Sequence, residues 1–261
     1  MPLAIRSWRS PSTPPSAAVP LPVPGRIRLP PGLHPPKARA DMDPRLAHID
    51  TWIFDLDNTL YPAGAALFAQ IEARMTDYVV ALEGCDRETA FAIQKRHFVA
   101  HGTTLSGLMA ERAIDPHEFL AFVHDVDMDR LSPNDRLVEA IARLPGRKLV
   151  FTNGDAPYAT RVLGRLGLHE SFEAIHDIHA TGYLPKPHAA AYDGLCKAWG
   201  IDPTRALFVE DMARNLPPAK AIGMTTVWID NGSEQVGVDR AAIDFVTTDL
   251  TAWLTGIWED L

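Results

Sequence analysis

Residues 51–59 read Thr-Trp-Ile-Phe-Asp-Leu-Asp-Asn-Thr, and this stretch decides the fold. The first four residues are β-branched or aromatic, and they predict a short strand that is buried on both faces of a sheet. Asp55 and Asp57 follow at once, so the strand enters a polar loop. Ligands bind beyond the carboxyl ends of the strands in open parallel sheets. The stretch therefore predicts that a ligand site begins where this strand ends.

A repeating order of strand and helix follows Pro133. Short apolar strands are expected at residues 148–151, 172–175, 206–209, 225–229 and 245–246, with helical patterns between them. Strands that are apolar along nearly their whole length and alternate with helices are typical of a parallel sheet covered on both faces. The predicted fold class is therefore α/β, with a Rossmann-like parallel sheet as the core.

The segment after the first strand interrupts this order. Its apolar residues recur at helical spacing, and the first set is Leu67, Ile71, Met75, Tyr78 and Leu82. Two further helices are expected at about residues 88–100 and 116–124. The predicted domains are an inserted all-helical cap at residues 62–133 and a core made of residues 44–61 and 134–261.

The first 43 residues differ from the rest in composition. Half of the 22 prolines lie in the first 36 residues, and large apolar side chains are few there. Such a stretch cannot bury enough apolar surface to offset the entropy lost on ordering, so residues 1–43 are predicted to be a disordered extension. Arginines without acidic residues would also suit an organellar transit peptide, and translation could start at Met42.

Charge and cysteine content limit the classes of function. Residues 1–40 carry six Lys and Arg and no acid, whereas residues 41–261 carry 19 basic and 33 acidic residues, a net charge of −14. Such an acidic body repels nucleic-acid phosphates, so no nucleic-acid partner is expected. No stretch approaches the roughly 18 apolar residues that cross a bilayer, so no membrane association is expected. Cys85 and Cys196 match no disulfide or zinc pattern and suit a cytoplasmic protein.

Polar residues follow the predicted strands at four places. They are Asp55 and Asp57, Thr152 and Asn153, Lys186, and Glu210 and Asp211. The carboxyl ends of parallel strands lie along one edge of the sheet, so these side chains are expected to converge. Packed carboxylates repel one another unless a cation neutralises them. Acids without a histidine or cysteine cluster favour a hard ion, and the expected cofactor is Mg²⁺.

Four short segments occur in a specific order along the chain. They are Asp-Leu-Asp-Asn-Thr at 55–59, Thr-Asn-Gly at 152–154, Pro-Lys-Pro at 185–187 and Glu-Asp-Met-Ala-Arg-Asn at 210–215. Together they resemble the four motifs of the haloacid dehalogenase-like superfamily over about residues 50–232, and the helical insertion is similar to that superfamily's first type of cap. The segments at 54–62, 101–108 and 122–127 resemble its pyrimidine 5′-nucleotidase branch.

The resemblance implies catalytic roles for four residues. Asp55 would attack phosphorus and form an aspartyl-phosphate, and Asp57 would act as general acid and then general base. Thr152 would bind phosphoryl oxygens, and Lys186 would supply positive charge to Asp55 and the phosphoryl group. The dehalogenases of the superfamily lack an acid at the position of Asp57, because a departing halide needs no proton.

The resemblance also implies ligands for the ion and for the substrate. The Mg²⁺ ligands would be the Asp55 carboxylate, the Asp57 main-chain carbonyl, Asp211 and, directly or through the outer shell, Glu210. The substrate-binding candidates are Thr152, Asn153, Lys186, Tyr61, Thr103 and Thr104. Tyr61 could stack on a base or pack under the cap, and the two cap threonines could instead form a turn or start a helix.

Other motifs carry weaker hypotheses. His97 and His101 are four residues apart, as in a zinc-binding helix, but residue 98 is Phe and no third ligand is evident, so a surface or packing pair is expected. The chain has neither a Walker-type Gly-Lys-Ser/Thr loop nor a Gly-x-Gly-x-x-Gly sequence, so ATP and dinucleotide binding are not expected.

Taken together, the residues and the resemblance predict a Mg²⁺-dependent hydrolase of small phosphomonoesters. The expected substrate is a pyrimidine nucleoside 5′-monophosphate such as UMP or CMP. Three alternatives stay open: a phosphatase of another metabolite such as a phosphoglycolate or sugar phosphate, a phosphomutase, and a phospholigand-binding regulatory module without turnover.

Overall fold

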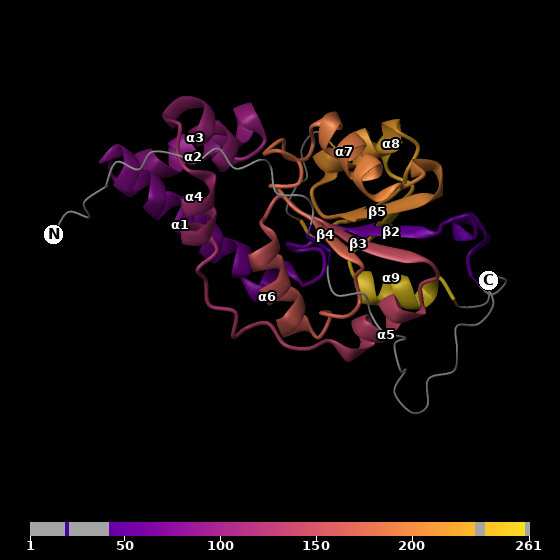
Figure 1. Ribbon diagram of the computed structural model, residues 1–261. Coiled ribbons are helices and arrows are strands. Elements are labelled where there is room, and N and C mark those ends of the chain that lie inside the picture. Colours follow the sequence, from indigo (N-terminus) through magenta and orange to yellow (C-terminus); the bar gives the residue numbers. More distant parts are fainter. Residues whose placement is uncertain (1–18, 21–41, 233–237, 259–261) are drawn as a thin grey trace.

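The computed structural model describes residues 19–20, 42–232 and 238–258, and a seven-stranded sheet lies at its centre (Figure 1). The strand order is β1-β4-β3-β2-β5-β6-β7. The strands are β1 (Val19–Pro20), β2 (Thr51–Phe54), β3 (Arg147–Phe151), β4 (Ala174–His176), β5 (Ala206–Glu210), β6 (Thr225–Ile229) and β7 (Phe245–Thr247). The pairs among β2 to β7 are parallel. The predicted α/β class with a Rossmann-like parallel core is confirmed.

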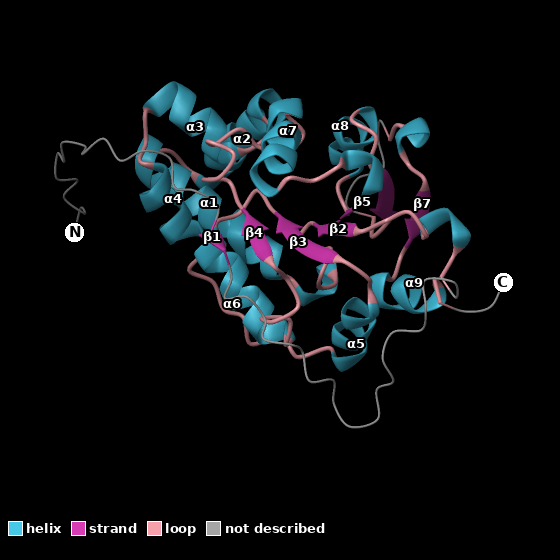
Figure 2. Ribbon diagram, turned by 45° about the vertical axis from the view of Figure 1, so that its right-hand side comes forward, coloured by secondary structure: helices cyan, strands magenta, loops and turns pink. Residues whose placement is uncertain are grey.

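Helices cover both faces of the sheet (Figures 1 and 2). One face carries α5 (Asp135–Arg143), α6 (Ala156–Leu166) and α9 (Leu250–Gly256), and the other carries α7 (Ala189–Trp199) and α8 (Leu216–Ala221). Successive side chains of a strand point to opposite faces. Phe54 therefore packs in the core on the α5, α6 and α9 side, and Ile53 packs on the α7 and α8 side. Burial on both sides explains why the central strands β2 and β5 are apolar along nearly their whole length.

Strand β2 lies in the middle of the sheet. Ile53 stands opposite Leu149 of β3 and Phe208 of β5. Asp55, two residues after Ile53, continues this ladder of hydrogen bonds, because its N–H donates to the Val209 carbonyl at 2.9 Å. The polar residue that follows the strand is thereby held at the carboxyl edge of the sheet.

The segment between β2 and α5 supplies four helices that pack together. They are α1 (Leu67–Glu83), α2 (Arg87–His101), α3 (Thr104–Arg112) and α4 (Pro116–Val123). Tyr78 of α1 lies edge-on against Phe119 and Phe122 of α4, with ring centroids 5.0 and 5.6 Å apart. Figure 1 shows these helices at the end of the sheet toward which β2 runs. Three of them occupy the predicted helical ranges, and α3 begins at Thr104, where the sequence left a helix start open as an alternative.

Aspartates begin several of the helices. Asp86 accepts the Thr89 N–H at the start of α2, and Asp115 accepts the His117 N–H at the start of α4. These side chains satisfy backbone donors that have no partner within the helix, which fixes where each helix begins.

None of the helices in the described ranges combines the length and the apolar character that crossing a membrane requires.

The N-terminal segment differs from prediction in two respects. Val19–Pro20 pair antiparallel with β4, although they belong to the stretch predicted to be disordered. Residues 1–18 and 21–41 of that stretch lie outside the described residues. Met42 is buried, and the Asp43 N–H donates to the Ile257 carbonyl at 2.8 Å. The packed core therefore begins before residue 44.

Candidate active site

A buried lysine forms the centre of the site. Lys186 Nζ donates to Asp55 Oδ1 at 2.6 Å, to Glu210 Oε2 at 2.7 Å and to the Phe151 carbonyl at 2.9 Å. Burial opposes the charge of Lys186, but Asp55 and Glu210 outweigh this effect and raise the pKa of the ammonium. The loops after β2 and β4 and the end of β5 thus meet around one cationic group, as the order of the motifs predicts.

Asn153 fixes the position of this lysine. The Lys186 N–H donates to Asn153 Oδ1 at 2.9 Å, and Asn153 Nδ2 donates to the Lys186 carbonyl at 3.2 Å. The amide therefore binds the main chain of Lys186 on both sides. These contacts make Asn153 a positioning residue for Lys186, and since Asn153 also lines the cavity described below, its role in substrate binding stays a prediction.

Three carboxylates lie close together at the same edge. One oxygen from each of Asp55, Glu210 and Asp211 lies within 4.8 Å of the others, and all three residues are buried. Burial, followed by the charge of Glu210, raises the pKa of Asp55 to about 7 and that of Asp211 to about 9. This excess of negative charge over the one lysine, together with donors that are all carboxylate oxygens, fits a hard divalent cation.

Asp57 faces a different set of partners. Its Oδ1 accepts hydrogen bonds from the Tyr61 hydroxyl at 2.5 Å and from the Tyr158 hydroxyl at 2.6 Å. Its carboxylate does not belong to the group of three acids, so its predicted contribution to the ion, the main-chain carbonyl, stays a prediction. Tyr61 is only 2% exposed and is not among the residues that line the cavity described below. These observations favour the packing alternative, and its role in substrate binding stays a prediction.

Behind Tyr158 lies a pair of residues that the sequence did not reveal. The rings of His124 and Tyr158 stack with centroids 4.3 Å apart, and His124 Nδ1 lies 3.0 Å from Asp155 Oδ1. Burial would raise the pKa of Asp155, but the hydrogen bond and charge of His124 hold this pKa below its usual value. His124 follows α4 and Asp155 begins α6, so this pair links the helical segment to the core.

A cavity of about 430 Å³ lies between α1–α4 and the carboxyl edge of the sheet. From the core, its lining includes Asp55, Asp57, Thr152, Asn153, Lys186, Glu210, Asp211 and Arg214. From the helical segment, it includes mostly apolar residues, among them Phe68, Ile71, Met75, Phe98, Leu105 and Phe119. The cavity thus has a charged floor and a largely apolar roof.

The predicted threonines all reach this cavity. Thr152 is buried, and its Oγ1 accepts the Gly154 N–H at 2.9 Å, which shapes the loop after β3. Thr103 caps α3 by accepting the Ser106 N–H, and Thr104 is the first residue of that helix. Arg214, from the motif at residues 210–215, also lines the cavity, as do Lys95 and Glu72. Lys95 and Glu72 form an ion pair across 23 residues of sequence, which local patterns do not predict.

The sequence matches a known family and a curated protein. The profile of the family described as haloacid dehalogenase-like hydrolase matches residues 49–223, more than half of the chain. The chain is 25% identical over 206 residues to the phosphate metabolism protein 8 of Saccharomyces cerevisiae. This match covers 73% of the chain but only 63% of the relative, so the chain spans less than two thirds of that relative's length.

Solved structures share the fold. The HAD-hydrolase YfnB of Bacillus subtilis, described as bound to magnesium, gives a TM-score of 0.53 at 16% identity, covering 81% of this chain and 99% of that chain. A HAD phosphatase from Thermococcus onnurineus gives a TM-score of 0.54 at 18% identity, covering 80% and 97%. L-2-haloacid dehalogenases are also among the neighbours. At such identities the likeness shows the fold alone.

Proposed function

The chain belongs to the haloacid dehalogenase-like hydrolase family, and from that membership we propose that it hydrolyses small phosphomonoesters through an aspartyl-phosphate on Asp55. One observation carries the proposal. Lys186 holds Oδ1 of the buried Asp55, which leaves Oδ2 to act as a nucleophile, and a second acid stands two residues further on. A fixed nucleophile, a fixed cation and a separate proton donor are what transfer of a phosphoryl group requires.

Each step can be assigned to residues of this chain. Asp55 Oδ2 forms a bond to phosphorus while the bond to the leaving oxygen breaks, and Asp57 gives that oxygen a proton. Asp57 then takes a proton from a water molecule, whose oxygen attacks phosphorus and releases Asp55. Lys186 and Thr152 stabilise the charge on the phosphoryl oxygens.

For the metal ion we propose Mg²⁺, with Asp55 and Asp211 as side-chain ligands and the Asp57 carbonyl as a third. When bound, the ion would offset the negative charge that raises the pKa of Asp55 and would let two anions approach. Glu210 was predicted as a possible ligand. Its two oxygens already accept the Lys186 ammonium and the Met212 N–H, so we assign it to the positioning of Lys186.

Asp57 favours a phosphatase over a dehalogenase. An alkoxide is a poor leaving group without a proton, whereas a halide departs without one. Two tyrosine hydroxyls hold the Asp57 carboxylate in one orientation next to the cavity. A second carboxyl kept in place in this way has a use in ester hydrolysis and none in halide displacement.

For the substrate we propose a pyrimidine nucleoside 5′-monophosphate. A volume of about 430 Å³ with an apolar roof suits a leaving group that carries a base and a sugar. Aromatic side chains such as Phe98 offer surfaces on which a base could stack. A phosphoglycolate or a sugar phosphate would leave that apolar surface without a partner, which makes these substrates the second choice.

Phosphate release from a panel of esters tests both parts of the proposal. UMP and CMP should give a higher kcat/KM than phosphoglycolate or sugar phosphates, and a preference for the latter would overturn the substrate assignment. Asp55→Asn should abolish turnover of every ester while the protein still unfolds cooperatively. Retained turnover in that variant would refute the nucleophile, and ligand binding without turnover in the wild type would favour the regulatory module.

A further inference from the structure

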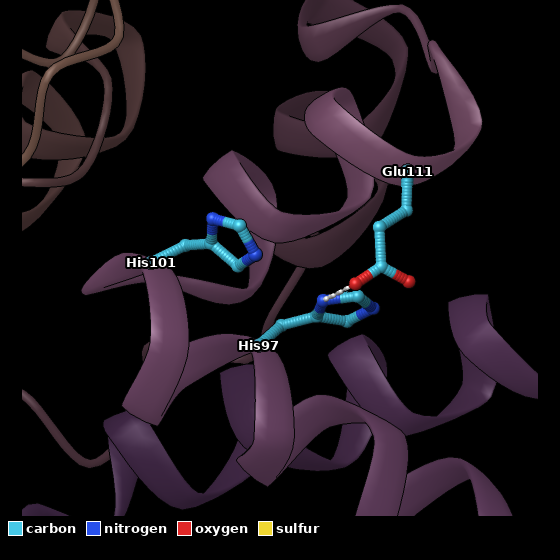
Figure 3. Close-up of side chains that lie close together, drawn as sticks. All are labelled: His97, His101 and Glu111. Carbon is cyan, nitrogen blue, oxygen red and sulfur yellow. Dashed lines mark ion pairs between the residues drawn. The ribbon is translucent and has the colours of Figure 1, made fainter.

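His97 and His101 gain in the structure the third ligand that the sequence did not reveal. Glu111 of α3 lies beside the two histidines of α2, and suitable ligand atoms of the three residues lie within 4.8 Å of one another (Figure 3). His97 Nδ1 and Glu111 Oε1 are 3.6 Å apart. We propose that these three residues form a site for a divalent transition-metal ion, Zn²⁺ above all, separate from the acidic site of the core.

The polar atom of His97 that faces this site is otherwise unsatisfied. His97 is 1% exposed, and its Nδ1 has no hydrogen-bond partner among the described residues. A buried ring nitrogen without a hydrogen bond is costly, and a neutral imidazole is the form that binds a metal ion.

The separation of the donors also matches a metal ion. Zn²⁺ binds imidazole nitrogen and carboxylate oxygen at about 2.0–2.2 Å, so two ligands at a tetrahedral angle lie about 3.4 Å apart. The 3.6 Å between His97 Nδ1 and Glu111 Oε1 is too long for a hydrogen bond but close to this value. Two nitrogens and one oxygen select Zn²⁺ over Mg²⁺, which prefers oxygen ligands alone.

Rigid elements hold the three ligands. His97 and His101 are i and i+4 on α2 and therefore share one face of the helix. Gly107 lets α3 approach this face, because a Cβ there would lie 2.3 Å from His97 Nδ1. Arg96 holds the other oxygen of Glu111, with Nη2 at 3.1 Å from Oε2, and so leaves Oε1 toward His97.

The site is accessible and lies near the cavity. Glu111 is exposed and His101 is partly exposed, so an ion can enter from solvent and keep a water molecule as its fourth ligand. Gly102 and Thr103 connect the two helices that the ion would join, and both line the cavity. Binding would therefore tie α2 to α3 at the turn that forms part of the cavity wall.

Zinc titration of the full chain against a chromophoric chelator tests the proposal. We use the Asp211→Asn background, which weakens the acidic site of the core, so that the cap site is measured alone. One Zn²⁺ per chain should bind there, and Glu111→Gln and His101→Ala should each weaken binding by at least about tenfold. The matched controls Glu88→Gln and His169→Ala change exposed residues outside the site and should leave the affinity unchanged.

The results distinguish zinc binding at the cap site from unfolding and from binding at the acidic site. Glu111 is on the surface, so its substitution does not threaten the fold and failure to bind cannot be blamed on unfolding. Equal zinc affinity in Glu111→Gln and Glu88→Gln would overturn the proposal, as would zinc binding that disappears with Asp211→Asn. These results do not depend on phosphatase activity, so the proposed function could fail while the zinc site stands, and the reverse.

Discussion

Replacing Lys186 by Met should destabilise the protein by about 3–5 kcal/mol at pH 8, beyond the loss of catalysis. The ammonium makes hydrogen bonds to two carboxylates and one carbonyl, and its side chain is 1% exposed. Methionine fills the same volume but leaves Asp55 and Glu210 as neighbouring buried acids without a counter-charge. The cost is therefore the desolvation of uncompensated carboxylates rather than the value of one ion pair.

The cost should depend on pH in a defined direction. Lys186 lowers the pKa of Asp55, which stands at about 7 even with the lysine present, so its removal moves that pKa higher. On folding, both proteins take up a proton at Asp55 between its unfolded pKa and about pH 7, so the destabilisation is nearly constant there. It grows as the pH rises from about 7 to 9, where only the variant keeps Asp55 protonated. Urea unfolding of metal-free protein across this range measures the effect.

Two controls sharpen this test. Lys220→Met removes a 2.6 Å ion pair to Asp244 at the surface and should cost no more than about 1 kcal/mol. Adding Glu210→Gln to Lys186→Met should restore part of the lost stability, because one of the two unpaired acids disappears. A loss below about 1 kcal/mol in Lys186→Met, or a double variant less stable than the single one, would refute the reasoning.

Three further outcomes are expected. Tyr158→Phe removes one of the two hydrogen bonds that orient Asp57. Because a hydrogen bond to a charged group contributes about 1.5–3 kcal/mol, kcat should fall about 10- to 100-fold at nearly constant KM. An unchanged kcat would contradict this role of Tyr158. Burial lowers the pKa of His176 from 6.5 to about 4, so between these pH values the unfolded state binds a proton that the folded state does not. The free energy of unfolding should therefore fall by on the order of 2–3 kcal/mol between pH 6.5 and 4. His176→Gln should reduce this pH dependence in thermal melts, and an unchanged pH dependence would show that another group causes it. Chelation by EDTA should stop phosphate release and Mg²⁺ should restore it, whereas activity that survives chelation argues against the acidic site as the site of the ion.

The strands and the order of the motifs could be predicted because they rest on local patterns. A strand buried on both faces must be apolar throughout, and Asp55 comes directly after such a strand. Parallel topology then brings the ends of β2, β3, β4 and β5 to one edge of the sheet, which is why Lys186, in the loop after β4, and Glu210, at the end of β5, meet as expected. Proximity followed from the fold class and needed no knowledge of side-chain geometry.

Contacts between remote segments could not be predicted in the same way. Asp57 and Tyr158 are 101 residues apart, and only the packing of α6 against the loop after β2 brings them together. The sequence left Tyr61 with two alternatives, stacking on a base or packing under the cap, and it could not show that the Tyr61 hydroxyl donates to Asp57. Glu111 was not predicted as a third ligand beside His97 and His101, because the sequence did not define the range of the helix α3 that carries it.

In the proposed mechanism the two aspartates of the first motif need opposite properties, and the structure gives them different surroundings. Asp55 must stay ionised to attack phosphorus, and it lies beside the Lys186 ammonium in a buried acidic group that a cation would neutralise. Asp57 must exchange a proton twice in each cycle, and its hydrogen-bond partners are the neutral hydroxyl groups of Tyr61 and Tyr158. Strand β2 ends at Phe54 and the chain turns from Asp57 on, so the two acids have different surroundings although only Leu56 separates them. His124 of the helical segment stacks on Tyr158, which donates to Asp57, so these two rings connect the helical segment to the proposed proton donor.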